Sequence, residues 1–492
     1  MPPGDGPGDG LFDPIFTTDE LAAATSDHAW VTRMLEFEAA LAVAEARAGV
    51  VPPEAADAIG RCCRSIDVDL AALGHAARLG ATPVIPLVAQ LRRLLPPEAA
   101  RWAHFGATSQ DVLDTALMLV LQRGLELVSD DLHRLSGAAA ALAEEHRSTL
   151  IAARTLLQHA APTTFGRKVA GWLVAIVEVG QVLTEVRRRR LAVQLGGPAG
   201  TLAALGTSGP AVVEALASEL GLGVPVLPWH TDRTRVVEVS SALALAAGVA
   251  AKIALDVALL MQTEVSEAFE PSAAGRGASS ALPHKRNPSM AAEIMADGRR
   301  AAALAGAVLA GMAQEHERAV GGWQAEWQTM SELARAAGGA VAFAADLLGG
   351  LEVDRTRMEN NLALTRGLVV AERVTLELAP HIGYDQARRV VEEASRRAAQ
   401  SSQPLEGALS EGGREMGGGI GEVGIGEVGI GEVGARKVAA GEAGLGEMGG
   451  PGLADVLAEL PADLFDPAAW LGSSELYVDR ALDLYRKAYA DD

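Results

Sequence analysis

The sequence contains little that could build a disulfide-bonded or sheet-rich protein. Only two cysteines are present, and they are adjacent at Cys62 and Cys63, a spacing poorly suited to a bond between them. Aromatic residues make up only 4% of the chain, so Ala, Leu and Val supply most of the hydrophobic content. This composition favours helices over strands. The cysteine usage predicts a protein of the reducing cytoplasm.

Positive charge is also scarce. The chain has 42 Lys and Arg against 63 Asp and Glu, a net charge of −21, whereas general nucleic-acid binding needs a basic surface. No uninterrupted apolar run reaches the ~20 residues that cross a bilayer. The ten histidines lack metal-ligand spacing, and neither a nucleophile elbow nor a dinucleotide fingerprint occurs. We therefore expect no metal, no cofactor, no nucleic acid and no membrane as partners.

What the sequence does contain is a series of long helical patterns. Of the 492 residues, 49% are hydrophobic and 21% are charged, which is typical of a folded chain. The stretch Val236–Glu270 is apolar nearly all round, so we expect a helix there that is buried on all sides, with other subunits as possible cover. Charges recur at three- and four-residue spacing over 112–150, 165–195, 234–270, 289–318, 323–350 and 367–400. Helices of this length predict an all-α protein with an elongated bundle.

One segment departs from this pattern. Residues 411–452 repeat Gly-Glu-Val-Gly-Ile and hold a high density of glycine, which opposes both helix and packed core. We interpret the segment as a flexible surface insertion. A phosphate-binding loop is excluded, because the segment has neither a Gly-Lys-Ser/Thr end nor a preceding strand.

A second irregular stretch, Gly275–Pro288, interrupts the helical pattern on both sides with Gly, Pro, Ser and Asn. It predicts a long loop that Arg276, Lys285 and Arg286 make cationic within an acidic protein. A mobile cationic loop suits closure over a small polyanion. From composition alone, a solvated basic loop explains the same residues equally well.

Three further stretches carry polar side chains. Thr108-x-x-Asp111 reads as a capping box that opens a helix, and its free N–H groups with Ser109 could also receive a carboxylate. His159 lies among polar residues in 154–166, where a structural histidine is the more common explanation. In 228–235, Arg233 and Arg235 could clamp carboxylates or form a salt-bridge cluster at a helix start.

These stretches, in this order, resemble the fumarase/aspartase superfamily. Ser279-Ser-Ala-Leu-Pro-His-Lys-Arg-Asn-Pro288 is similar to its signature Ser-Ser-x-Met-Pro-x-Lys-x-Asn-Pro, and the likeness runs from about residue 11 to 488. The resemblance implies a three-domain helical subunit whose long helices form a multi-helix core in a homotetramer, with active sites shared between subunits. We divide the chain accordingly into an N-terminal domain (1–110), a central bundle (111–365) with a catalytic loop at 273–288, and a C-terminal domain (366–492).

The resemblance also assigns roles to residues. It implies an aci-carboxylate intermediate, with Ser279 exchanging the proton at the α-carbon and with Lys285 as a second catalytic group. The residues that it places against a polycarboxylate substrate are His104, Thr108, Ser109, Gln158, His159, Arg235, Ser280 and Asn287.

Departures from the superfamily pattern favour one of its branches. Leu156 stands where adenylosuccinate lyases carry their acid histidine, and an amine leaving group needs such a proton donor. Ala-Thr-Ser-Gln-Asp, Leu-Leu-Gln-His-Ala and Pro-Trp-His-Thr resemble the carboxymuconate cycloisomerase branch. That branch lactonises 3-carboxy-cis,cis-muconate in protocatechuate degradation, without a cofactor. The alternatives are adenylosuccinate-type elimination of fumarate and a non-catalytic protein that keeps the fold.

Overall fold

The all-α class is confirmed by the computed structural model, which describes residues 10–415 and 453–490. Within these residues, strands form only two short antiparallel pairs. The chain divides into two compact units. Unit 1 contains the described residues up to Glu145, Val169–Val353 and those from Val478 onward, and unit 2 contains His146–Lys168 and Asp354–Tyr477. The three-domain division stays a prediction.

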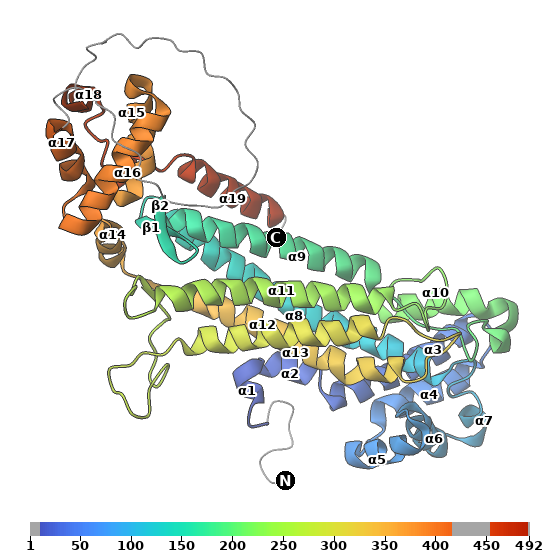
Figure 1. The fold of residues 1–492 in the computed structure, drawn as a ribbon. Coiled ribbons are helices and arrows are strands. Elements are labelled where there is room, and N and C mark those ends of the chain that lie inside the picture. The colour runs from blue at the N-terminus through green and yellow to red at the C-terminus, as the bar shows by residue number, and fades with distance from the viewer. Residues whose placement is uncertain (1–9, 416–452, 491–492) are drawn as a thin grey trace, which may run out of the picture. The chain divides into compact units, whose positions relative to one another are not determined.

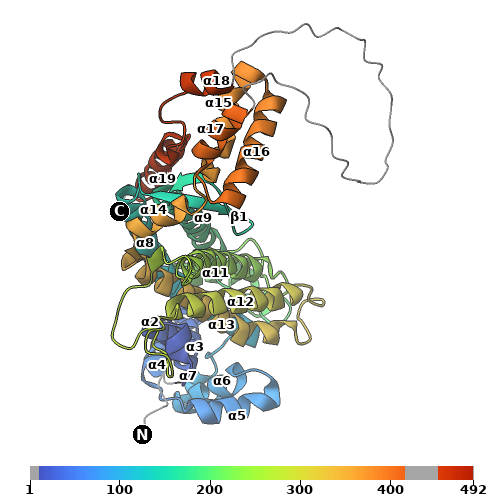
Figure 2. The same cartoon turned by 60° about the vertical axis from the view of Figure 1, so that its left-hand side comes forward.

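Long helices running side by side form the bundle of unit 1 (Figure 1). Helix α11 packs on α12, α12 on α13, and α13 on α8. Figure 2 shows α12 between α11 and α13. The longest, α8, would measure ~55 Å at the usual rise per residue. The bundle helices are α8 (Ser109–Glu145), α9 (Phe165–Arg190), α11 (Thr234–Leu260), α12 (Ser289–Ala310) and α13 (Gly322–Gly349).

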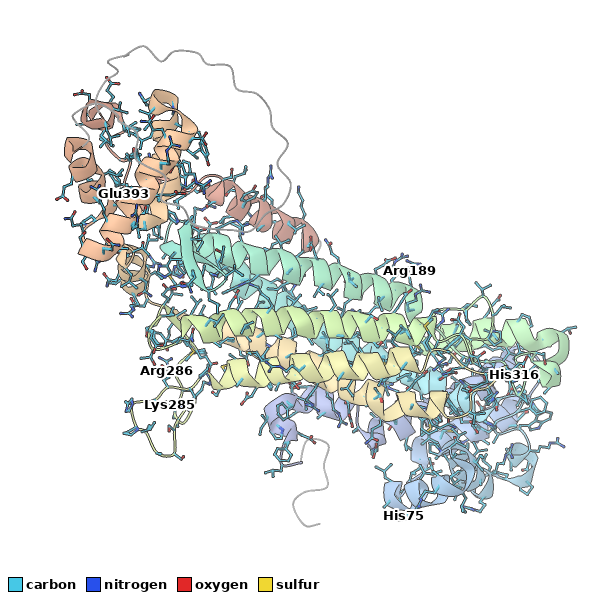
Figure 3. The ribbon with its side chains drawn as sticks, viewed as in Figure 1. His75, Arg189, Lys285, Arg286, His316 and Glu393 are labelled. Carbon is cyan, nitrogen blue, oxygen red and sulfur yellow. The ribbon has the colours of Figure 1, made fainter. Side chains whose placement is uncertain are left out.

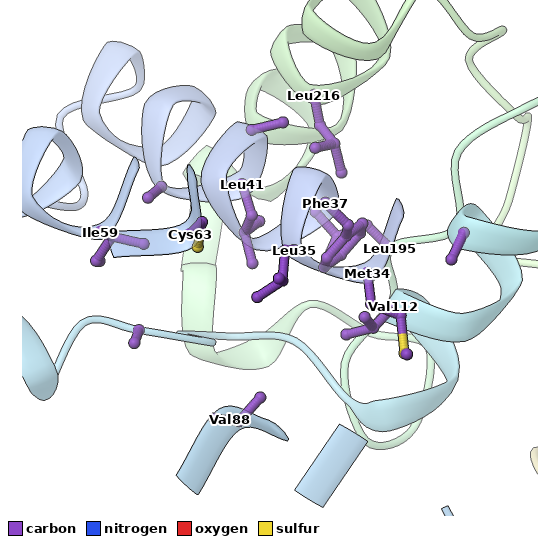
Figure 4. Close-up of a cluster of buried hydrophobic side chains, with 14 of the residues drawn as sticks. Met34, Leu35, Phe37, Leu41, Ile59, Cys63, Val88, Val112, Leu195 and Leu216 are labelled. Atoms are coloured by element: carbon purple, nitrogen blue, oxygen red, sulfur yellow. The ribbon is translucent and has the colours of Figure 1, made fainter. Parts of the chain in front are cut away.

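Shorter helices pack around α3 at one end of unit 1. Phe37 and Leu41 of α3 are fully buried against Ile59 of α4 and Leu216 of α10 (Figure 4). This core reaches the first turn of α8 through Val112. It therefore fixes the N-terminus of α8, where several predicted site residues lie. The helices of this region are α1 (Asp13–Phe16), α2 (Asp19–Ala24), α3 (Asp27–Arg47), α4 (Pro53–Ser65), α5 (Leu70–Gly80), α6 (Val84–Leu94), α7 (Pro97–Ala100) and α10 (Gly209–Leu220), with the 3-10 helix η1 (Ala203–Ser208).

The apolar helix α11 is shorter than the sequence predicted. It ends at Leu260, and Leu245 and Leu255 keep 50% and 44% of their surface exposed in the single chain. Helices α9 and α11 are both long and apolar enough to cross a membrane by length and composition alone, as core helices of soluble proteins often are. The expected burial of this helix against other subunits stays a prediction, because the structure describes one chain.

Unit 2 combines a hairpin with a cluster of helices. Val374, Leu378 and Val391 belong to the core between α15, α16 and α17. The sequence pattern 367–400 is divided at Gly383, whose φ of 81° ends one helix and begins the next. The elements are β1 (Leu150–Thr155), β2 (Gln158–Thr164), α14 (Arg355–Ala363), η2 (Leu368–Val370), α15 (Ala371–Ile382), α16 (Tyr384–Ser401), α17 (Leu405–Glu415), α18 (Leu453–Glu459), η3 (Pro467–Ala469) and the start of α19 (Ser474–Ala488).

The predicted glycine-rich insertion begins later than expected. Residues 411–415 belong to helix α17 rather than to a loop. The rest of the predicted insertion, 416–452, lies outside the residues that the structure describes.

The hairpin β1–β2 was not predicted, and its turn is unusual. Thr155 pairs with Gln158, so Leu156 and Leu157 alone form the turn, with φ values of 50° and 65°. Two-residue turns with positive φ at both positions ordinarily use Asn-Gly, because leucine is strained there. Both side chains are also exposed, by 97% and 74%. Strain together with exposed apolar surface is typical of a functional position.

Replacing this turn by Leu156→Asn with Leu157→Gly should stabilise unit 2. Two residues that tolerate positive φ would remove a backbone cost of ~1–2 kcal/mol for each leucine. We expect a rise of a few degrees in the midpoint of thermal unfolding, measured by calorimetry.

The double variant Leu156→Ala with Leu157→Ala is the matched control, because it removes the exposed apolar surface but keeps the strained backbone. It should not show the rise. A lower midpoint for the Asn-Gly variant would contradict the described turn.

Candidate active site

The predicted catalytic loop connects β3 (Ala268–Phe269) to α12, and its neck is closed by hydrogen bonds. The backbone N–H of Asn287 donates to the carbonyl oxygen of Gly277 at 2.9 Å, and the Asn287 side-chain amide donates to the same oxygen at 3.1 Å. Gly277 has φ 65°, and a Cβ atom there would lie 2.4 Å from the carbonyl oxygen of Asn287. The residues between, including Ser279, Ser280 and Lys285, therefore form one closed segment.

The two arms of the loop are attached to the bundle through Glu352, on strand β4 (Glu352–Val353). Its carboxylate accepts the backbone N–H of Ser272 at 2.9 Å and the guanidinium of Arg286 at 3.1 Å. Both bonds lower the pKa of Glu352, and the bond with Arg286 has the larger effect. Arg286 thus anchors the loop. Lys285 has no ion-pair partner among the residues that the structure describes, so its charge remains available to an anion (Figure 3).

Ser279 is half-buried within the closed segment. Its Oγ accepts the backbone N–H groups of Leu282 at 3.1 Å and Ala281 at 3.4 Å. Donors that face a hydroxyl oxygen stabilise negative charge on it. The local backbone therefore favours release of the Ser279 proton.

A second group of predicted residues lies at the N-terminus of α8. Thr108 donates its backbone N–H to Asp111 at 2.9 Å, which is the return bond of the predicted capping box. The fully buried Asp111 carboxylate also accepts N–H bonds from Gly196 and Gly197 at 3.0 and 2.9 Å, and it pairs with His230 at 2.7 Å. Asp111 is therefore a structural residue. Ser109 begins α8, where N–H groups lack helical partners.

Arg318 and His104 supply two basic side chains to this region of the chain. Arg318 donates to the hydroxyl of Thr108 at 3.2 Å and to the carbonyl of Pro198 at 3.1 Å. Nδ1 of His104 lies 2.7 Å from Oε1 of the buried Glu38. Burial opposes the charged imidazolium, but the charge of Glu38 and its hydrogen bond outweigh burial and raise the pKa of His104. The terminus thus combines the guanidinium of Arg318 with N–H and hydroxyl donors, which are groups that bind a carboxylate.

Sequence reasoning missed Arg318 and Glu38. The expected helix 289–318 included Arg318, whereas α12 ends at Ala310 and leaves Arg318 in the connection to α13. Glu38 lies inside an ordinary helical pattern, and only its pairing with a residue 66 positions away distinguishes it. The one signal that could have identified these residues was Arg318, a basic residue in the connection between two helices.

Both arginines of the fourth stretch have partners within the chain. Arg233 is fully buried and lies between Asp114, at 2.8 Å, and Glu326, at 3.0 Å, so the salt-bridge interpretation applies to it. Burial raises the pKa of Glu326 despite this pairing. Arg235 donates to the carbonyl oxygen of Arg190, the last residue of α9, at 3.0 Å. Burial is the main cause of its lowered pKa.

The predicted site residues form separate groups. The loop group and the α8 group lie toward opposite ends of the bundle, near Lys285 and His316 respectively in Figure 3. Helix α12 separates the loop from the connection that carries Arg318, and its 22 residues span ~33 Å. Gln158 and His159 belong to the hairpin of unit 2, where His159 pairs with Arg154 in the strand register. Within unit 1, one chain therefore does not bring the two groups together.

Among the described residues, no group of His, Cys, Asp and Glu side chains could hold a metal ion.

Comparison with known proteins gives a consistent picture. The family described as "Lyase" matches residues 15–303. The 3-carboxy-cis,cis-muconate cycloisomerase of Pseudomonas aeruginosa is 44% identical, over 97% of both chains. Nitrosuccinate lyase of Streptomyces davaonensis is 45% identical over 82% of this chain and 87% of that protein. The crystal structure of the 3-carboxy-cis,cis-muconate lactonizing enzyme from Pseudomonas putida matches with a TM-score of 0.83 and 38% identity, covering 97% of this chain and 99% of that one.

The closed neck of the loop generates a prediction. Gly277→Ala should open the neck, because the new Cβ collides with the carbonyl oxygen of Asn287. Misplacement of catalytic groups by about 1 Å can reduce turnover about 100-fold. We expect a loss of this order in kcat, measured by steady-state kinetics, with thermal stability nearly unchanged.

Gly275→Ala is the matched control. Gly275 also has positive φ, 81°, but nothing lies within 4 Å of a Cβ at this position. Equal losses in the two variants would show that backbone strain, and not closure of the neck, governs activity.

Proposed function

Because the chain belongs to this lyase family, within the fumarase/aspartase superfamily, we infer that it catalyses the cycloisomerisation of 3-carboxy-cis,cis-muconate to a carboxymuconolactone. The observation that carries this inference is 44% identity to a cycloisomerase over 97% of both chains. The Ser279, Lys285 and Asn287 signature supports catalysis and disfavours a purely structural protein. The reaction belongs to the degradation of aromatic compounds through protocatechuate.

The proposed reaction needs positive charge next to the substrate, because negative charge builds up on one of its carboxylates. One carboxylate oxygen adds to a carbon of a double bond, and the π electrons move toward the carbon next to another carboxylate. That carboxylate becomes an aci-carboxylate dianion until the α-carbon receives a proton from Ser279. Lys285 and Asn287 stabilise the dianion, and each well-placed donor can contribute ~3–4 kcal/mol. In the reverse direction, Ser279 removes the same proton.

The hairpin turn supports lactonisation over elimination of an amine. Leu156 has no proton to donate, and an amine must be protonated as its bond to carbon breaks. A carboxylate departs as a stable anion when the lactone opens, so this reaction needs no acid at that position. Gln158 and His159, next to the turn, remain candidate substrate contacts.

Elimination from nitrosuccinate is a second candidate. The Streptomyces davaonensis nitrosuccinate lyase is 45% identical to this chain, although over a smaller share of it. A nitro group that leaves as nitrite is also a stable anion, so the absence of an acid at Leu156 fits both reactions.

We further propose a homotetramer in the cytoplasm, with each site assembled from several copies of the chain. The loop group and the α8 group lie at opposite ends of α12, which supports sharing between subunits. Uncovered Leu245 and Leu255 on α11 supply apolar surface for such an interface. The small polycarboxylate substrate would then lie between chains.

A direct assay tests the activity. The purified protein should consume 3-carboxy-cis,cis-muconate, followed as loss of its diene absorbance, with kcat/KM in the range ~10⁴–10⁸ M⁻¹s⁻¹ that is common for enzymes. Adenylosuccinate and nitrosuccinate serve as comparison substrates, with release of fumarate or nitrite as the readout. Faster turnover of either one would replace the assignment.

Ser279→Ala should reduce turnover of 3-carboxy-cis,cis-muconate by about 10²–10⁴-fold, because the proton donor is lost. Light scattering should show an unchanged assembly, since Ser279 lies on a loop outside the hydrophobic cores. Ser65→Ala, at the exposed end of α4, is the control and should keep full activity.

The same variant tests whether sites are shared. When Ser279→Ala is unfolded and refolded together with Thr108→Val, mixed tetramers should contain some sites with both residues intact and regain activity. Failure to regain any activity, with mixed tetramers demonstrated, would overturn the shared site.

A further inference from the structure

We propose that Glu38 is a positioning residue that keeps His104 doubly protonated, so that the imidazolium binds a carboxylate of the substrate at the N-terminus of α8. Glu38 itself touches no substrate and acts through His104. The proposal rests on the proposed function, because it assumes a polycarboxylate substrate.

The hydrogen bonding of Glu38 is directed almost entirely to His104. Its side chain is only 1% exposed, and Oε1 lies 2.7 Å from Nδ1 of His104. Oε2 is buried with no hydrogen-bond partner in the described part of the chain. By contrast, the equally buried Asp111 accepts bonds from several donors. A buried carboxylate with so little support depends on a cationic partner.

Two titratable groups near Glu38 are held in their neutral forms by burial. Glu45 lies two turns along the same helix and is fully buried. Burial, reinforced by the charge of Glu38, raises the pKa of Glu45 to about 9, so Glu45 is neutral at physiological pH. Burial likewise raises the pKa of the Cys63 thiol, which stays neutral. Neither group competes with Glu38 for the role of counter-ion to His104.

The groups that face His104 favour its protonated form. Glu38 and Asp111 act on it as negative charges, and Arg92 acts as a positive one. Arg92 lies against the preceding residue, where it donates to the carbonyl oxygen of Ala103 at 2.8 Å. Two carboxylates against one guanidinium leave a net attraction for a proton on His104.

The backbone at His104 is held in an unfavourable conformation. Its φ is 59°, which costs ~1 kcal/mol or more for a residue other than glycine. Two hydrogen bonds hold the backbone and the side chain at this position. Arg92 donates to the carbonyl oxygen of Ala103, and Nδ1 of His104 bonds to Glu38. Such strain persists only where the surrounding contacts over-determine the position, as they do at functional sites.

The protonation state decides what His104 can do. When Nδ1 holds the only proton, Nε2 carries a lone pair that repels a carboxylate. When both nitrogens are protonated, Nε2 becomes a charged donor that can bind a carboxylate. The cation is present at low pH and is lost as pH rises through the raised pKa of His104. Removal of the Glu38 charge would move this loss to lower pH.

The test is a proton NMR titration of His104 in the full-length protein, assigned with His104→Gln. In the wild type, the His104 signal should titrate above the usual value for histidine, and in Glu38→Gln its midpoint should fall clearly below the wild-type one. A wild-type midpoint at or below that of free histidine would overturn the proposal, whether or not the variant folds.

Kinetics provide the second readout. At neutral pH, Glu38→Gln should raise KM for 3-carboxy-cis,cis-muconate about tenfold with kcat little changed, which corresponds to loss of one charged hydrogen bond. KM of the wild type should rise with pH through the His104 midpoint, and this dependence should be absent in His104→Gln. An unchanged KM in a folded Glu38→Gln protein whose His104 midpoint has fallen would overturn the substrate-binding part.

Glu45→Gln is the matched control. It lies on the same helix, is equally buried, and replaces a carboxyl that is already neutral by an amide of similar shape. It should leave both the titration of His104 and KM unchanged. The titration needs no substrate, so it is independent of the proposed function. The expected titration of His104 without turnover of 3-carboxy-cis,cis-muconate would support the pairing with Glu38 and overturn the proposed function. Turnover with an unperturbed His104 would overturn the pairing alone.

Discussion

The position of the long helices depends on one buried guanidinium. Arg233, just before α11, binds Asp114 on α8 and Glu326 on α13, and Trp323 donates to Asp114 at 3.0 Å. Burial of a charge costs several kcal/mol unless its partners are well placed, so the helices cannot slide past one another without exposing unpaired ions. Because Asp111 lies one turn before Asp114 on α8, the same constraint fixes the terminus that carries Thr108.

Local sequence patterns were sufficient for the helices and for the loop. Long runs of Ala, Leu and Val predicted the bundle, and the glycines and prolines of 275–288 predicted the break before α12. The hairpin was missed because Leu156 and Leu157 occupy a turn that ordinarily shows Asn-Gly. Neither residue favours the positive φ of this turn, so the local sequence carries no signal for it.

The candidate site was predictable only in part, for a related reason. Ser279, Lys285 and Asn287 lie close together in sequence, so a motif identifies them. Pairings over long separations are different: 66 positions for Glu38 with His104 and 210 for Arg318 with Thr108. A pairing between residues so far apart in the chain produces no periodic pattern in the sequence. Composition also could not tell which arginine of 228–235 is buried, because burial follows from helix packing.

Helix α12 is a continuous helix with one group of predicted site residues beyond each end. Its first turn follows the Ser279 loop, and its last turn leads into the connection that holds Arg318. In an assembly where these ends serve different pockets, a loop that shuts over one substrate pulls on the same helix that positions a cation for another. Neighbouring pockets would then communicate mechanically, and occupancy of one would alter the readiness of the next.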